Sequence, residues 1–448
     1  MGALNMDAEL IKRIDEEIDK ARDLVAQDTI TLVRINSEQG EPAPGAPFGT
    51  GPKEVLDTVL KMGKKDGFYC TDYGVGIVSL SLKEGKPDLG IWLHGDVVPA
   101  GDGWIYPPYE GTMYKGTHII GRGATDNKGQ LSAIFNILKI FKKLGIELNY
   151  NPALYVGSNE ETGMEDVKAF VAKYEPPRMS LVPDSGFPVG YGGKGSILIT
   201  FRSKKPLHGL TLSAGLPKSP GKANAELNGN TYETESPPRH GANPDPNGNM
   251  ITKIAVKLLE DGLVDKEDTK ILEFLKDISL DVYGEKFGIS VIPEGMPRLT
   301  MNTKRLTTED GFPSLIMDIR YPVGITAEEI VERLTAAAEE YGIQIVKVGN
   351  VKPPYMMDKN APMVQLLAKI SNEVTGDTKE PYTIGGGTYA HRLPNAYIYG
   401  MDGNAKPEDF PEGHGSAHGK DEMVSLDRLQ RAMRIYARAM LALNEVQW

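Results

Sequence analysis

The chain has 448 residues and a mass of 48.9 kDa, more than one hydrophobic core usually organises, so we expect at least two domains. A hydrophobic share of 40% with 25% charged residues is typical of a folded globular protein and excludes a low-complexity chain. The net charge of −11 argues against nucleic acid or an anionic membrane as a partner and favours cationic partners, including metal ions.

Cysteine content and the lack of long apolar stretches limit where the protein acts. Cys70 is the single cysteine and cannot form an internal disulfide, which suits a reducing compartment; we expect it to be a small buried hydrophobic side chain. The N-terminus contains no apolar core of a signal peptide, and no stretch approaches the ~20 apolar residues of a membrane span. We therefore expect a cytoplasmic protein with no membrane partner.

The first 190 residues alternate helical and strand patterns. Apolar residues recur at a spacing of three and four from Ile11 to Val25, and again from Leu131 to Phe141, which predicts two amphipathic helices. Strands that alternate with helices predict an α/β sheet whose reactive groups lie on loops beyond the strand ends. The predicted strands are the short apolar runs 75–80, 89–93, 154–157 and 181–183.

The central segment has a different composition. A stretch rich in Gly, Pro and Asn runs from Gly209 to Asn249, and helical spacing then begins near Ile254 and near Ile271. We predict that residues 191–354 form an inserted second domain.

Helical spacing returns at the C-terminal end of the chain, most clearly over 426–443. We predict that residues 355–448 rejoin residues 1–190 in one discontinuous domain.

Polar residues directly follow several of the apolar runs. His94 and Asp96 stand two residues apart after the run 89–93. His94 could bind a metal while Asp96 holds the imidazole in its metal-binding tautomer. Taken alone, the pair is also typical of a capped strand end with a hydrogen-bonded histidine.

Carboxylates occupy further positions of this kind. Asp126 precedes the helix that begins near Leu131, and alone it fits a helix N-cap. Glu160 and Glu161 are adjacent and cannot both point the same way, so one could bind a cation while the other stays available as a base; a solvated acidic loop is the alternative. Asp184 follows the last apolar run of this region.

The set as a whole favours a metal site. Two imidazoles and several carboxylates at the ends of separate apolar runs form a mixed nitrogen and oxygen ligand set suited to Zn²⁺ or Mn²⁺. The second imidazole belongs to a C-terminal segment that contains both His414 and His418. A carboxylate can bridge two ions, and dinuclear sites with ions ~3.5–4 Å apart serve hydrolases.

The ordered motifs of the chain resemble those of metallopeptidase family 20, the dizinc exopeptidases that include aminoacylases, succinyl-diaminopimelate desuccinylases and dipeptidases. They are most similar to the PepV-type dipeptidases, from about Asp7 to the last helix. The resemblance implies an α/β zinc-exopeptidase catalytic domain of the phosphorylase/hydrolase-like kind with an inserted α+β lid domain. The motifs are HGDVVP, GRGATDNKG, NEETG, VPDSGFP, HGANPDPNGN, DIRYP, GGGTY and HGKDE.

The resemblance also implies the ligands of two divalent ions, Zn²⁺ or Mn²⁺ with Co²⁺ as a further candidate. Asp126 matches the ligand that bridges both ions. The matched sets are His94, Asp126 and Asp184 for one ion, and Asp126, Glu161 and His418 for the other.

Two acidic residues and one choice between histidines complete the implied catalytic centre. Glu160 matches the general base, and Asp96 matches the carboxylate behind the first histidine. His418 is preferred over His414 because the segment HGKDE keeps the family's spacing from the histidine to a paired acidic end.

The lid is expected to contribute residues that contact the substrate. His240 matches the histidine that helps to hold the developing oxyanion, and Asn224 matches a substrate-contacting asparagine. Arg320 matches the arginine that grips the C-terminal carboxylate of the substrate, a role that suits the fork of a guanidinium group.

A glycine run completes the implied substrate site. Gly386 and Gly387, followed by Thr388, permit a close approach of the backbone to a ligand, and a tight turn is the alternative. After Tyr389, the PepV-type pattern has a small residue and then arginine, whereas His391 stands here before the arginine. This departure leaves the side-chain preference for the substrate open.

The resemblance implies a metal-dependent dipeptidase that hydrolyses dipeptides with a free C-terminal carboxylate, by means of a metal-bridging water and Glu160 as general base. The alternative within the family is an N-acyl amino acid deacylase. Outside the enzymes, the alternative is a non-catalytic peptide- or metal-binding relative, against which the presence of Glu160 argues. Because the lid supplies its histidine within one chain, we expect a monomer whose lid closes over a small peptide.

Overall fold

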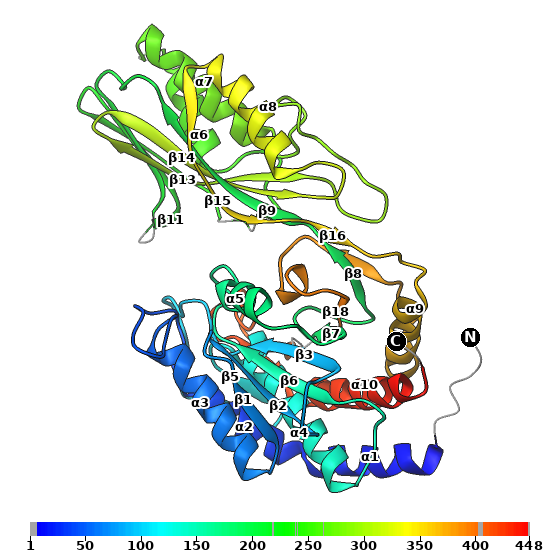
Figure 1. Ribbon diagram of the computed structural model, residues 1–448. Helices are drawn as coiled ribbons and strands as arrows, with labels where there is room; N and C mark the ends of the chain where they lie inside the picture. Colours follow the sequence, from blue (N-terminus) through cyan, green and yellow to red (C-terminus); the bar gives the residue numbers. More distant parts are fainter. Residues whose placement is uncertain are drawn as a thin grey trace. The chain divides into compact units, whose positions relative to one another are not determined.

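The computed structural model describes residues 7–216, 219–237, 239, 241–262, 264–401 and 406–446. The chain divides into two compact units, whose elements are labelled in Figure 1. The first unit contains Met1–Tyr191, Asp358–Tyr382 and Thr388–Trp448, and the second contains Gly192–Met357 and Thr383–Gly387.

The N-terminal helical pattern forms two helices. Helix α1 spans Ala8–Lys20, and helix α2 spans Arg22–Val33. Ala21 lies between the two helices and belongs to neither. The prediction of one continuous helix over 11–25 is therefore wrong, because the spacing of apolar residues does not reveal a break of one residue.

A mixed sheet forms the core of the first unit. Its strands within that unit are β1 (Tyr69–Asp72), β2 (Ile77–Ser81), β3 (Leu89–His94), β6 (Pro152–Gly157), β7 (Met179–Val182) and β18 (Ala396–Ile398). In the sequence, β8 (Gly190–Gly193) and β17 (Tyr382–Ile384) cross the boundary between the units, and β16 (Tyr355–Met356) belongs to the second unit. Their order is β1-β2-β6-β3-β7-β18-β8-β16, with β17 beside β8. Strands β3, β6, β7 and β18 are parallel, as the alternation of strands and helices predicts.

The parallel strands bring the polar segments of the sequence to one edge of the sheet. His94 is the last residue of β3 and lies opposite Gly157, the last residue of β6. Strand β7 ends at Val182, two residues before Asp184. Because parallel strands end on the same side, the segments that follow β3, β6 and β7 share one edge.

Helices from both ends of the chain pack in the first unit. They include α3 (Thr50–Lys65), α4 (Gly129–Lys143), α5 (Glu165–Lys173), α9 (Pro362–Thr375) and α10 (Leu426–Asn444). Helix α10 packs against α4 and α9 (Figure 1). The C-terminal segment is therefore part of the same core as the N-terminal sheet.

A small antiparallel sheet connects two segments that carry candidate ligands. Its order is β19 (Met423–Ser425), β5 (His118–Ile120) and β4 (Thr112–Tyr114). Strand β5 precedes the π-helical turn η1 (Ala124–Lys128), which contains Asp126, and β19 follows the loop of His418. The pairing of β5 with β19 fixes these two segments relative to each other.

The second unit is an antiparallel sheet covered by helices. Its strands are β9 (Gly195–Ser203), β10 (Leu210–Leu216), β11 (Ser219–Leu227), β12 (Asn230–Glu235), β13 (Thr300–Glu309), β14 (Phe312–Tyr321) and β15 (Ile343–Lys352), and its helices are α6 (Met250–Glu260), α7 (Lys266–Leu280) and α8 (Ala327–Glu339). The strand order is β12-β11-β10-β13-β14-β9-β15. Strands and helices bury one shared apolar core, so this unit is α+β, as predicted.

None of the helices in the described part of the chain is long and apolar enough to cross a lipid bilayer.

Candidate metal centre

The cluster of acidic and imidazole side chains lies within the first unit. His94 ends β3, and Glu161 and Asp184 belong to the segments that follow β6 and β7. Asp126 lies in the turn η1, and His418 lies in the loop before β19. Five residues that are far apart in the sequence thus meet at one edge of the sheet.

The carboxylate of Asp126 stands between the two imidazoles. Its Oδ1 lies 2.9 Å from Nε2 of His94, and its Oδ2 lies 3.1 Å from Nε2 of His418. Nε2 of His418 also lies 3.0 Å from Oε1 of Glu161, and Nε2 of His94 lies 3.9 Å from Oδ1 of Asp184. Each oxygen of Asp126 therefore serves a different group of side chains, which is the arrangement of a bridging carboxylate.

The pKa of both imidazoles is raised, so both favour the protonated, positively charged form. Burial opposes protonation of His94, but the hydrogen bond to Asp126 and the nearby carboxylate of Asp184 outweigh it and raise its pKa well above the usual range. Hydrogen bonds to Asp126 and Glu161 raise the pKa of His418 to about 11. The cluster therefore stabilises cations at both ends of Asp126.

The carboxyl groups around Asp126 compete with one another for ionisation. Burial opposes ionisation of Asp126, but hydrogen bonds from His418 and His94 hold its pKa well below the usual range. Burial, and then the charge of Asp126, raise the pKa of Glu161 to about 7 and the pKa of Asp184 to about 6. Such crowded carboxylates are stabilised by bound cations, which displace the protons.

The donor atoms fit divalent metal ions. Ligand atoms of His94, Asp126 and Glu161 lie within 4.8 Å of one another, and so do those of His94, Glu160 and Asp184. A mixed set of imidazole nitrogens and carboxylate oxygens suits Zn²⁺ and Mn²⁺. The two groups share His94, and Asp126 belongs to the first, so the residues present are compatible with divalent ions at this cluster.

Asp96 supports the cluster in two ways. Nδ1 of His94 donates to the backbone carbonyl of Asp96 over 3.0 Å, which leaves Nε2 directed at Asp126. The carboxylate of Asp96 accepts the backbone N–H groups of Glu160 and Glu161, both over 3.1 Å. The carbonyl of Asp96 therefore orients the histidine, while its side chain anchors the loop of the paired glutamates.

Comparisons with known proteins identify the family of the chain. The sequence profile described as "Peptidase family M20/M25/M40" matches residues 91–442. The chain belongs to this peptidase family. A Staphylococcus aureus (strain USA300) protein, provisionally named as a dipeptidase, is 27% identical over 96% of this chain and 98% of its own length.

Solved structures of low sequence identity share the fold of this M20 family member. Human carnosine dipeptidase 1 is 16% identical with a TM-score of 0.61, over 97% of this chain and 100% of that chain. The di-peptidase Dug1p from Saccharomyces cerevisiae is 13% identical with a TM-score of 0.63, over 98% of this chain and 99% of that chain. The predicted family and fold class are confirmed.

The structure places His418, and not His414, in the cluster around Asp126. Nδ1 of His414 contacts Oδ2 of Asp421 instead. The Asp421 carboxylate also accepts the backbone N–H groups of Ile105 and Tyr106, each over 2.9 Å. His414 thus fixes the loop that carries His418 and does not face the cluster.

Arg122 and Glu422 form a buried ion pair beside the cluster around Asp126, and the sequence did not predict this pair. The carboxylate of Glu422 accepts the backbone N–H of Asp126 over 2.8 Å and a guanidinium N–H of Arg122 over 2.6 Å. Arg122 also donates to the backbone carbonyl of His418 over 3.4 Å. The only sequence signal is that both residues fall inside recognised motifs, GRGATDNKG and HGKDE.

Several predicted substrate residues belong to the second unit. Arg320 in β14 donates through Nε and Nη2 to the two carboxylate oxygens of Asp318, over 2.8 and 3.0 Å. Asn224 lies in β11, three strands away from β14 in the sheet, so the structure does not bring Asn224 beside Arg320. His240 lies outside the described residues.

The glycine run 385–387 ends at a boundary between the two units in the sequence. Gly386 and Gly387 belong to the second unit and Thr388 to the first. The hydroxyl of Thr388 accepts the backbone N–H of Ala390 over 3.2 Å and begins a short 3₁₀ turn, Tyr389–His391. Thr388 therefore has a local structural role in addition to its proposed contact with substrate.

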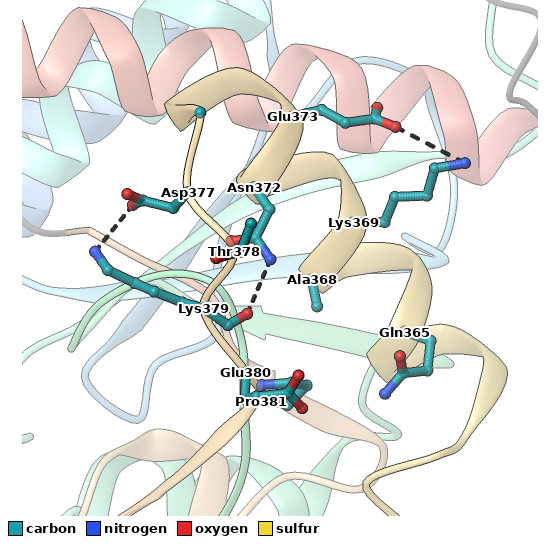
Figure 2. Close-up of a pocket in the computed structure, with 11 residues that line it drawn as sticks. Gln365, Ala368, Lys369, Asn372, Glu373, Asp377, Thr378, Lys379, Glu380 and Pro381 are labelled. Carbon is teal, nitrogen blue, oxygen red and sulfur yellow. Dashed lines mark hydrogen bonds and ion pairs between the residues drawn. The ribbon is translucent and has the colours of Figure 1, made fainter.

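A hollow of about 510 Å³ lies elsewhere in the first unit, beside α9 (Figure 2). Among its charged side chains, Lys369 pairs with Glu373 over 3.8 Å and Lys379 with Asp377 over 2.9 Å, and Glu380 pairs with Lys359 outside the hollow over 2.9 Å. None of the predicted site residues lines it. We therefore assign the chemistry of the protein to the cluster around Asp126.

Proposed function

We propose that this M20 peptidase is a dipeptidase that hydrolyses the amide bond of dipeptides with a free C-terminal carboxylate. The observation that carries the proposal is the position of Asp126, whose two oxygens face His94 and His418 separately. The names of its relatives support the substrate class, since the Staphylococcus aureus protein is provisionally named as a dipeptidase over nearly its full length.

The metal ions are held by two overlapping sets of side chains in this proposal. His94, Asp126 and Asp184 hold one ion, and Asp126, Glu161 and His418 hold the other. Divalent ions would supply Lewis-acid chemistry there, which would lower the pKa of a bound water toward ~7 and polarise the scissile carbonyl. We propose Zn²⁺ or Mn²⁺, with Co²⁺ as a further candidate.

Glu160 is the general base in this scheme. Its carboxylate lies close to ligand atoms of both His94 and Asp184, and its side chain is buried. It accepts the proton of the attacking water at a carboxylate oxygen and returns that proton to the leaving amine. The carboxylate of Asp96 accepts the backbone N–H of Glu160. This contact holds the loop and keeps the side chain of Glu160 directed at the cluster.

The second unit is proposed to bind the substrate. The guanidinium group of Arg320 has five N–H donors, of which Asp318 accepts two, so donors remain for the C-terminal carboxylate of a dipeptide. We propose that His240 stabilises the oxyanion and that Asn224, Gly386, Gly387 and Thr388 contact the substrate. The predicted monomeric state and cytoplasmic location stay predictions.

A panel of small substrates tests this function. The protein is loaded separately with Zn²⁺ and Mn²⁺, and hydrolysis of dipeptides with free amines is compared with hydrolysis of N-acetyl and N-succinyl amino acids. We expect turnover of dipeptides. Preference for acylated amino acids would instead identify a deacylase, and no turnover of either class would contradict an enzymatic role.

The variant Glu160→Gln tests the base. It keeps the shape of the side chain but cannot accept a proton, so kcat should fall by roughly 100- to 10,000-fold while the metal content stays unchanged. Glu165→Gln is the matched control, because Glu165 is an exposed glutamate nearby that pairs with Lys168. Unchanged hydrolysis in Glu160→Gln would contradict the assignment.

A further inference from the structure

The loop that follows β6 carries both paired glutamates of the metal centre. It begins at Ser158, directly after the last residue of the strand, and leads into α5. Asp96 holds this loop at Glu160 and Glu161 through their backbone N–H groups. A second buried carboxylate, which has no role in the proposed reaction, holds the first part of the loop at Ser158 and Asn159.

This second carboxylate is Asp166, in the first turn of α5. Its Oδ2 accepts the backbone N–H groups of Ser158 over 2.8 Å and of Asn159 over 2.9 Å. Its Oδ1 accepts the backbone N–H of Val167 over 2.7 Å. The side chain is fully buried, so these contacts and one further donor satisfy a group that water does not reach.

The further donor is the hydroxyl of Tyr389, which donates to Oδ2 of Asp166 over 2.5 Å. Tyr389 is 1% exposed and directly follows Thr388 of the glycine-rich motif. Its ring lies edge-on to Trp92 of β3, with ring centroids 6.4 Å apart. The ring is thus fixed by the core of the sheet while its hydroxyl reaches the loop of the glutamates.

Gly157 shows how closely these groups approach the end of β6. A Cβ atom at Gly157 would lie 1.9 Å from the hydroxyl of Tyr389 and 2.5 Å from Oδ2 of Asp166. Neither distance is possible between unbonded atoms, so the contact requires a residue without a side chain at this position. The sequence therefore supplies three matched residues, Gly157, Asp166 and Tyr389, from three different segments.

We propose that Asp166 and Tyr389 are positioning residues, which lock the start of the loop and thereby fix the directions of Glu160 and Glu161. The inference rests on the proposed function, because Glu160 is the base of that reaction. Asp96 holds the loop at the glutamates themselves, and Asp166 holds it one and two residues earlier. With both anchors in place, the backbone from Ser158 to Glu161 has little freedom to turn the base away from the cluster.

The variant Tyr389→Phe tests the role of the hydroxyl. It removes one oxygen and leaves the ring in place, so Asp166 loses one hydrogen bond in a buried site. We expect kcat for a dipeptide to fall by about 10- to 100-fold, with KM within about twofold of the wild-type value, as for other supporting hydrogen bonds behind metal centres. Tyr150→Phe is the matched control, because Tyr150 is also buried and its hydroxyl donates to the carbonyl of Met440 over 2.8 Å.

Hydrogen exchange of the loop amides gives a readout that does not depend on activity. In the ion-loaded protein, the amides of Ser158 and Asn159 should exchange at least about tenfold faster in Tyr389→Phe than in Tyr150→Phe, because their acceptor is less firmly held. Asp166→Asn should show the same change, since it replaces one acceptor oxygen by an NH₂ group. Asp268→Asn is its control, because Asp268 is a buried carboxylate in α7 that accepts the backbone N–H of His208 over 2.8 Å.

Failure of this inference differs from failure of the proposed function. If the wild-type protein hydrolyses dipeptides but both loop variants match their controls in kcat and in amide exchange, the positioning role is wrong. If both loop variants fail to fold while both controls fold, the contacts serve stability alone, and the positioning role is also wrong. If the wild-type protein turns over no dipeptide, the proposed function fails first, whereas the exchange measurement still decides whether Asp166 and Tyr389 hold the loop.

Discussion

Asp126 is the residue on which the metal centre depends most. Its two carboxylate oxygens face different imidazoles, and its backbone N–H is held by the buried carboxylate of Glu422. The resemblance to the peptidase family identified Asp126 and the four other candidate ligands from the sequence. The sequence does not identify the role of Glu422, because its partners lie about 300 positions away. Most of these partners are backbone N–H groups, which every residue except proline has, so no residue type indicates the contact.

Replacing Asp126 with asparagine tests the shared ligand. The amide keeps one oxygen but loses the charge and the second acceptor, so we expect fewer than two ions per chain and a fall in kcat/KM of at least roughly 1,000-fold. Metal analysis of the purified protein and dipeptide hydrolysis measure both effects. Asp427→Asn is the control, because Asp427 forms an exposed ion pair with Arg22; equal ion content in the two variants would contradict a shared ligand.

The strands of the two units differ in how well the sequence predicts them. The stretch 209–249, distinguished by its Gly, Pro and Asn content, contains β10, β11 and β12. Buried residues do alternate there, as in Leu210, Leu212 and Ala214, but small alanines and intervening turn residues weaken the period-two signal. By contrast, strands β3, β6 and β7 were predictable because each is a continuous apolar run, as buried parallel strands are.

The ion pair between Arg122 and Glu422 acts at the level of elements, because it joins three segments. Arg122 donates to the carbonyls of Pro99 and Ala100 and to that of His418, while Glu422 caps the turn η1. Both side chains are buried, with exposures of 1% and 0%. The pair therefore connects the loop after β3, the turn of Asp126 and the loop of His418.

Glu422→Gln should be strongly destabilising for this reason. It leaves the guanidinium of Arg122 buried without a counter-charge, which costs about 3–5 kcal/mol of unfolding free energy, and it should weaken ion binding by about 10- to 100-fold. Urea unfolding and competition with a chelator measure the two effects. The exposed pair between Glu233 and Lys222 provides the control Glu233→Gln, which should change the unfolding free energy by less than about 1 kcal/mol. A similar small loss in Glu422→Gln would contradict the role given to the pair.

At the scale of the whole molecule, the candidate ligands and most of the proposed substrate contacts belong to different units. All the candidate ligands belong to the first unit, whereas Arg320 and Asn224 belong to the second. The sequence predicts that His94, Glu161 and Asp184 lie together, because each ends or follows a strand of one sheet whose parallel strands end at the same edge. It predicts the substrate contacts less well, because positions such as Arg320 pair with neighbours like Asp318, and no rule of periodicity distinguishes a substrate contact from such a pair.

Removal and return of the ions should therefore act on one unit. A chelator should abolish dipeptide hydrolysis, and Zn²⁺ or Mn²⁺ should restore it.

Ions at 100 times their dissociation constant stabilise the folded state that binds them by about 2.7 kcal/mol. Because His94 ends β3 and Glu161 and Asp184 follow β6 and β7, hydrogen exchange should slow in these strands on ion binding while the β9–β14 core of the second unit changes little. Full hydrolysis in the ion-free protein would contradict the metal dependence. Equal protection of both units would show that ion binding stabilises the chain as a whole and not through the cluster around Asp126 alone.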